Sequence, residues 1–383
     1  MELKFRIYYV IISLATFAVM SCARMEVQNA ETKLEYSGLS FNYVWETQSA
    51  DATKDSLYCI INKTRYTSHY FLKTDANGAI KSDKTVDNEE QVVDGVQFDS
   101  KYYLKSGEYT VYVFDKPQEG LIIDSLKNFL QSAATSPNDI VLRVREQNID
   151  DMELLKDESW EGTSWMSTLN SNYPYFYNID SVRFDMKTNY VIENGVDATI
   201  EFKPFNITQK VVMPFVVTAE EGVNIQKILI EFSGILERRY LTDNRAIIGD
   251  NDKGIGRIIL SADVVKKEGN DIYYQVVLHT LGLIPNLYSE VIYNGPGAIY
   301  MAIYAEAEGK KKMLRTTKNI SKYIKGSGGV AFDDKDKVFE ILTNEVVLNT
   351  GYHFNVTKEQ ITSDTEDGIQ EWEGDGNDFE GEI

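Results

Sequence analysis

The sequence predicts an all-β protein, for three reasons. Apolar and polar residues alternate in many runs, as in GLSFNYVWET, where Leu39, Phe41 and Tyr43 alternate with Ser40 and Asn42. Strict alternation is typical of a strand with one buried face. Most such runs are rich in β-branched and aromatic residues and are bounded by Gly, Asn, Asp or Pro, which also favours strands. The 383 residues, 43% of them hydrophobic, are enough for two domains of ordinary size.

The same features recur from residue 56 to residue 349. We expect strands in SLYCII, YLKSGEYTVYVFD, SVRFDMKTNYVI, ATIEFKPF, VVMPFVVTA, QKILIEFSGI, GRIILSADVV, DIYYQVVLHTLGL, AIYMAIYAEA and KVFEILTNEVVLN. Two successive β-sandwiches are favoured over one large barrel by this spacing.

One segment has a helical pattern. In IIDSLKNFLQSAATSPND, Asp124 or Ser125 can cap a helix, apolar residues follow on one side, and Pro137 ends it. The sequence therefore predicts a short helical insert over residues 124–135, within the first domain.

The amino-terminal segment has the features of a bacterial lipoprotein signal. Lys4 and Arg6 precede an apolar run from Ile7 to Met20. This run is too short for a spanning helix, which needs roughly 20 apolar residues, but it suits a signal peptide. The residues at the end of the apolar run, next to Cys22, resemble a lipobox, so Cys22 is predicted to carry acyl chains such as palmitate. The alternative is an ordinary secretory signal with a chance cysteine.

Cysteine content and charge restrict the remaining classes. If Cys22 is acylated, Cys59 is the one cysteine left in the sequence, and no intramolecular disulfide can form. A buried thiol in SLYCIIN usually acts as a small hydrophobe, and the alternative role as a nucleophile would need an activating histidine. The net charge of −20 argues against nucleic acid as a partner.

The predicted organisation has five parts. Residues 1–21 form the signal peptide, and residues 22–35 a lipidated tether. Residues 36–193 form an N-terminal β-sandwich domain with the helical insert, and residues 194–357 a C-terminal β-sandwich domain. Residues 358–383 form an acidic tail or strand.

The sequence shows no catalytic pattern. His69, His279 and His353 are far apart in the chain and no HExxH, CxxC, P-loop or GxSxG motif occurs. Two acidic turns offer weak calcium ligands, but their spacing departs from the EF-hand and solvated turns are the favoured interpretation. We therefore predict a protein that is not an enzyme, with no cofactor and no metal site. The acidic turns contain Asp243, Asp250 and Asp252, and Asp333, Asp334 and Asp336.

Two tryptophans offer a candidate binding surface. Trp160 and Trp165 lie in the loop-like segment DESWEGTSWMS, and exposed indoles on a loop can stack on sugar rings. The alternative, which we favour, is that they pack the loop onto the sandwich as a small satellite core.

A wider resemblance follows from the order of several motifs. The lipobox is followed by FNYVW, YLKSGEYTVYVFD, YPYFYNIDSV, EFKPFNITQKVVMPFVV, ILIEFSGILERRYLT and HTLGLIPN, and then by Tyr352–Val356 and an I-x-x-W at Ile369–Trp372. In this order the chain resembles the fimbrial anchor and minor-subunit lipoproteins of Bacteroidales, in the fimbrillin (type V pilus) superfamily.

The resemblance implies two transthyretin-like β-sandwich domains in tandem, an acyl anchor in the outer membrane, and a place in a cell-surface fimbrium. In that superfamily an Arg- or Lys-specific protease removes a first strand from stalk subunits, and a neighbour's strand fills the groove; Arg65 is a candidate cleavage site. Such contact is β-strand addition, and Ile369 and Trp372 are the candidate docking residues, unless this segment is an internal strand of the second sandwich.

The expected partners are outer-membrane lipid, other fimbrial subunits and host or bacterial surface ligands. A surface glycan-binding lipoprotein is the alternative function, and a purely structural envelope lipoprotein is a third.

Overall fold

The structure is a computed structural model, and it describes residues 36–45, 57–63, 69–75, 77–79, 96–98, 101–116, 120–124, 140–156, 165, 169, 172–248, 253–287, 294–333, 338–363 and 370–372. The predicted signal peptide, tether and Cys22 lie outside these residues. No helix among those described is long and apolar enough to cross a membrane.

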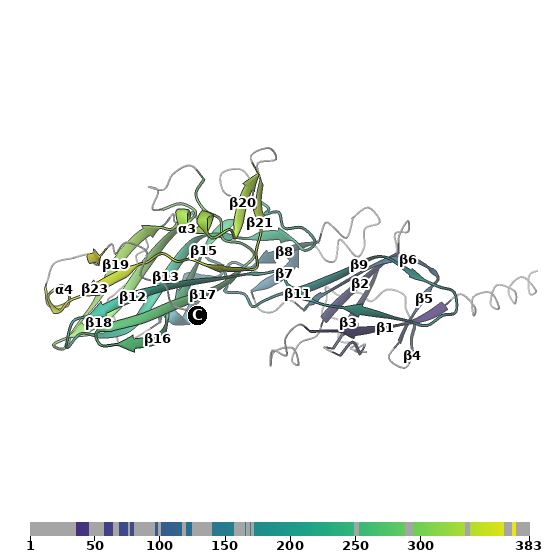
Figure 1. Ribbon diagram of the computed structural model, residues 1–383, viewed down its shortest axis with the longest axis horizontal. Helices are drawn as coiled ribbons and strands as arrows, with labels where there is room; N and C mark the ends of the chain where they lie inside the picture. Colours follow the sequence, from purple (N-terminus) through teal and green to yellow (C-terminus); the bar gives the residue numbers. More distant parts are fainter. Residues whose placement is uncertain are drawn as a thin grey trace, which may run out of the picture. The chain divides into compact units, whose positions relative to one another are not determined.

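The described chain is built almost entirely from strands, which confirms the all-β prediction (Figure 1). Its described helices are short. Asp124, one of the two proposed caps of the predicted helix, is instead the last residue of a strand, and the other, Ser125, lies with residues 126–135 outside the described part. The helices are η3 (Ile149–Asp151), η4 (Glu153–Leu155), α3 (Ser321–Gly326) and α4 (Lys358–Thr362).

The chain forms two compact units. The sequence predicts one boundary between domains near residue 193, but each unit contains more than one segment of the chain. Unit 1 takes its described residues from 36–116 and 184–205, and unit 2 takes them from 120–183 and 206–372. The physical reason is strand pairing, because residues 198–202 pair with residues 39–43 and so belong to the first unit.

Unit 1 consists of two sheets, in the orders β10-β1-β5-β4 and β11-β9-β6-β2-β3. The first contains β1 (Tyr36–Tyr43), β4 (Val96–Phe98), β5 (Lys101–Lys105) and β10 (Ala198–Phe202). The second contains β2 (Leu57–Lys63), β3 (His69–Thr74), β6 (Gly107–Asp115), β9 (Arg183–Ile192) and β11 (Phe205–Asn206).

One apolar core joins the two sheets of unit 1. The alternation in β1 buries Leu39, Phe41 and Tyr43, as the sequence predicts, and β2 contributes the buried Cys59. Burial raises the pKa of the Cys59 thiol, so the thiol stays protonated and acts as a small hydrophobe.

Unit 2 consists of two larger sheets and two small ones. One large sheet has the order β16-β17-β12-β23-β24, with β22 also beside β12, and the other has the order β15-β13-β18-β19. Their strands are β12 (Gln209–Ala219), β13 (Asn224–Leu236), β15 (Ile255–Ser261), β16 (Asp263–Glu268), β17 (Asp271–Thr280), β18 (Ala298–Ala307), β19 (Lys310–Asn319), β22 (Glu345–Val347), β23 (His353–Val356) and β24 (Gln370–Trp372).

The small sheets complete the unit. One has the order β14-β8-β7, and the other pairs β20 with β21. Their strands are β7 (Leu121–Asp124), β8 (Val141–Val144), β14 (Arg238–Tyr240), β20 (Val330–Asp333) and β21 (Val338–Ile341).

The sheet around β13 and β18 is buried on both faces. Along β13 the even-numbered Ile228, Ile230 and Phe232 are buried, and so are the odd-numbered Leu229 and Glu231 between them. The odd-numbered face carries a second apolar cluster, which residues before β9 cover. This cover consists of Met152, Leu169 and, partly buried, Ile149, Leu154, Leu155, Trp165 and Tyr175.

Candidate strand-addition sites

The first candidate site is the position of β1, because β1 lies between two other strands of its sheet. It pairs antiparallel with β5 and parallel with β10, where Phe41 is opposite Ile200. The hydroxyl of Tyr43 is hydrogen-bonded to that of Thr74 at 2.8 Å, and burial raises the pKa of Tyr43. A strand in this position gains main-chain hydrogen bonds on both edges and three buried side chains on one face.

The candidate cleavage residue Arg65 lies outside the described residues, in the connection between β2 and β3. The strands on its amino-terminal side are both internal to their sheets, because β1 lies between β10 and β5 and β2 lies between β6 and β3. A cut at Arg65 would therefore leave β1 and β2 attached to the rest of unit 1 by hydrogen bonds and packing alone.

The second candidate site is the edge formed by β23. β24 pairs antiparallel with β23, with Trp372 opposite His353 and Glu371 opposite Phe354. Ile369 lies outside the described residues. Residues 370–372 thus pair with a strand of the chain's own second unit, and a docking role for Ile369 and Trp372 stays a prediction.

A third edge was not anticipated from the sequence. GRIILSADVV reads as one strand, but it is two, because the chain leaves the β13 sheet after β15 and enters the β12 sheet as β16. All six residues of β16 are exposed, including Val264 (49%) and Val265 (57%). Lys266 and Lys267 lie on the same strand, and lysines on an edge discourage indiscriminate pairing.

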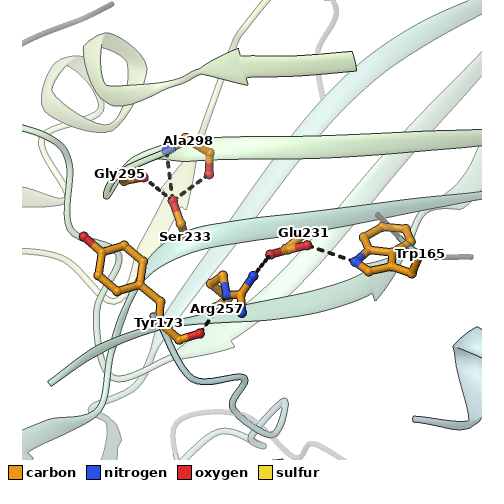
Figure 2. A network of polar contacts seen from close by, with 7 residues as sticks. All are labelled: Trp165, Tyr173, Glu231, Ser233, Arg257, Gly295 and Ala298. Carbon is orange, nitrogen blue, oxygen red and sulfur yellow. Dashed lines mark hydrogen bonds and ion pairs between the residues drawn. The ribbon is translucent and has the colours of Figure 1, made fainter. Parts of the chain in front are cut away.

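Trp165 is held in a buried network of polar contacts (Figure 2). Glu231 is 0% exposed. Its Oε1 accepts from Nη1 of Arg257 at 3.0 Å, and its Oε2 accepts from Nε1 of Trp165 at 3.1 Å. Arg257 Nε donates to the carbonyl oxygen of Tyr173 at 2.8 Å, and its guanidinium lies 4.0 Å from the ring centroid of Tyr175.

This network has consequences for the candidate glycan surface. The indole of Trp165 also meets Tyr300 edge-on, with ring centroids 4.9 Å apart, so this side chain packs against the β13 and β18 sheet. Trp160 lies outside the described residues, and a platform made from both indoles stays a prediction.

The side chains of His279 and His353 are described by the structure, whereas that of His69 lies outside the described part. Nε2 of His353 lies 2.5 Å from the hydroxyl of Thr218, which also donates to Asp271. Burial, and then the charge of Lys210, lower the pKa of His279. Of the calcium candidates, Asp243 is paired with Arg245. No group of three His, Cys, Asp or Glu side chains that could hold a metal ion occurs in the described part of the chain.

Comparison with known proteins gives structural neighbours only. No family model matches the chain, and a search of curated proteins finds no significant match. Among solved structures, the fimbrial anchor protein Mfa2 from Porphyromonas gingivalis is 9% identical, with 88% of this chain and 96% of that chain covered and a TM-score of 0.38.

The chain is similar to Bacteroidales adhesins and fimbrial proteins. A candidate adhesin from Bacteroides ovatus is 11% identical, with 76% of this chain and 85% of that chain covered and a TM-score of 0.40. The tip fimbrial protein Mfa3 from Porphyromonas gingivalis is 12% identical, with coverages of 88% and 100% and a TM-score of 0.32. At these identities no residue role is transferred.

Proposed function

We propose that this chain is a non-enzymatic, lipid-anchored subunit of a cell-surface fimbrium, with tandem transthyretin-like domains, which contacts neighbouring subunits by β-strand addition. The observation that carries the proposal is β24, a three-residue strand on the β23 edge. A segment that pairs with this edge through main-chain hydrogen bonds can pair in the same way with the corresponding edge of a neighbouring subunit.

Attachment to the outer membrane is proposed to depend on Cys22. Two or more acyl chains hold a protein on a bilayer, since each buried CH₂ contributes about 0.8 kcal/mol. We expect Cys22→Ala to move the protein from the membrane to the soluble fraction, measured by fractionation and immunoblotting. Cys59→Ala is the matched control and keeps the membrane location. A Cys22→Ala protein that remains with membranes would place the anchor elsewhere.

The assembly role is tested by removing β24. Because Ile361 of α4 is 2% exposed, a chain that ends at Gly368 is a sharper variant than one that loses residues 358–383. We expect it to fold and to stay on membranes, but to recover at least about tenfold less of its neighbouring fimbrial subunits in co-purification, which corresponds to about 1.4 kcal/mol of contact free energy.

The control for this experiment is Val265→Asp on β16, which changes another edge of the same sheet and is expected to leave recovery unchanged. Equal recovery of subunits by the shortened chain would exclude β24 as the contact. Unfolding of the shortened chain would show that β24 is an obligatory strand of unit 2.

A further inference from the structure

α4 connects the two large sheets of unit 2 just before the C-terminal strand. It follows β23 of one sheet and lies against β18 and β19 of the other. A capping box fixes its start, since Gln360 N donates to Thr357 Oγ1 and Thr357 N donates to Gln360 Oε1. Ile361 is buried, so α4 is held at its start and along its apolar side.

Two lysines of β19 hold the other end of α4. Nζ of Lys310 donates to the carbonyl oxygen of Thr362 at 2.8 Å, and Nζ of Lys312 donates to that of Ser363 at 3.3 Å. Carbonyls at a helix C-terminus lack partners within the helix and carry partial negative charge. Ammonium groups are therefore well suited to bind this end.

The strand pattern explains why these two lysines are involved. Side chains alternate between the faces of a strand, so Lys310 and Lys312 share a face with the fully buried Leu314. Lys311 shares the opposite face with Met313, which belongs to the cluster under Trp165.

The position of α4 restricts the C-terminal strand. Residues 364–369 connect Ser363 to β24, and three of these six residues, Asp364, Glu366 and Asp367, are acidic. When Ser363 is held by the lysines, a short linker keeps β24 close to the β23 edge. This raises the effective concentration of β24 at that edge.

We propose that Lys310 and Lys312 are positioning residues that hold β24 on its own β23, and so set the fraction of molecules whose C-terminal strand is available to a neighbouring subunit. This inference rests on the proposed function. A strand that is released more often occupies its own edge less, which makes both the strand and the edge available for pairing with another chain.

The test is amide hydrogen exchange of the full-length purified chain, followed at Gln370–Trp372 with amides of β12 as the internal reference. We expect Lys310→Gln and Lys312→Gln each to accelerate exchange in β24 roughly threefold, and the double variant roughly tenfold, since partly exposed contacts of this kind are individually weak. The β12 amides and the urea midpoint stay unchanged, which separates positioning from general stability.

Lys311→Gln is the matched control, because it removes the same charge from the opposite face of β19, and it leaves β24 exchange unchanged. Lys312→Arg keeps a hydrogen-bond donor at this position, so we expect the β24 amides of this variant to exchange as slowly as in the parent chain. Equal acceleration by Lys311→Gln, or unchanged exchange in the double variant, would overturn the proposal. The measurement uses the isolated chain, so its failure is distinguishable from a failure of subunit co-purification.

Discussion

Replacing Glu231 with alanine is expected to lower the free energy of unfolding of unit 2 by about 3–5 kcal/mol. The substitution leaves the Arg257 guanidinium, whose residue is 6% exposed, without its carboxylate partner, and an uncompensated buried charge is costly. It also removes the acceptor of the Trp165 indole N–H. Urea-induced unfolding followed by circular dichroism measures the loss.

The matched control is Glu345→Ala, which breaks the exposed pair of Lys210 and Glu345, with Nζ–Oε1 at 3.0 Å. Exposed pairs contribute about 1 kcal/mol or less, so this variant remains close to the parent. If Glu231→Ala and Glu345→Ala cost the same, the Glu231 network does not hold the covering segment on the sheet.

The isosteric variant Glu231→Gln separates charge from shape. It keeps an acceptor for Trp165 but removes the negative charge beside Arg257. We expect a loss smaller than that of alanine but clearly larger than that of the exposed control, because the desolvated guanidinium stays uncompensated.

Replacing Phe41 with alanine is expected to destabilise unit 1 by about 3–5 kcal/mol. Phe41 is 5% exposed and stacks with Phe202 of the neighbouring strand, with ring centroids 6.3 Å apart. The loss combines the transfer free energy of the ring with the cost of the cavity left between the two sheets. Thermal and urea unfolding of the purified variant measure it.

Tyr36→Ala is the control in the same strand, because Tyr36 is 41% exposed, and we expect it to cost about 0.5 kcal/mol. A loss below about 1 kcal/mol for Phe41→Ala would show that β1 is held loosely and is open to exchange with a donor strand. The large loss that we expect means that β1 is a built-in strand of this subunit, and strand addition then concerns the β23 edge.

Several elements follow from local pattern alone. In β1 the alternating Leu39, Phe41 and Tyr43 are buried, whereas Asn42 between them is exposed. In β12 burial also alternates over Gln209–Phe215, although its sequence from Val211 to Val217 is a continuous apolar run. Local pattern is sufficient in β1 because successive side chains of a strand point to opposite faces, so burial of one face appears directly in the sequence.

The partners of these strands depend on distant residues. β1 pairs with β10, whose residues lie about 160 positions further along the chain, and this pairing removes residues 198–202 from the predicted second domain. No feature of FNYVW specifies that neighbour, because main-chain hydrogen bonds are the same for every sequence and the choice is made by packing of both sheets around one core.

The sequence by itself determined the strand content of this protein and the buried face of its amphipathic strands. The tertiary structure alone decided that Glu231, in the middle of an apolar strand, meets Arg257 and Trp165. It also decided that GRIILSADVV divides between two sheets, and that Lys310 and Lys312 contact the end of α4. The physical reason is the distance along the chain over which each feature is determined. Alternation of apolar and polar residues depends on neighbouring residues. The partner of a buried charge, of a strand that changes sheet or of a helix end is set only when segments far apart in the chain pack together.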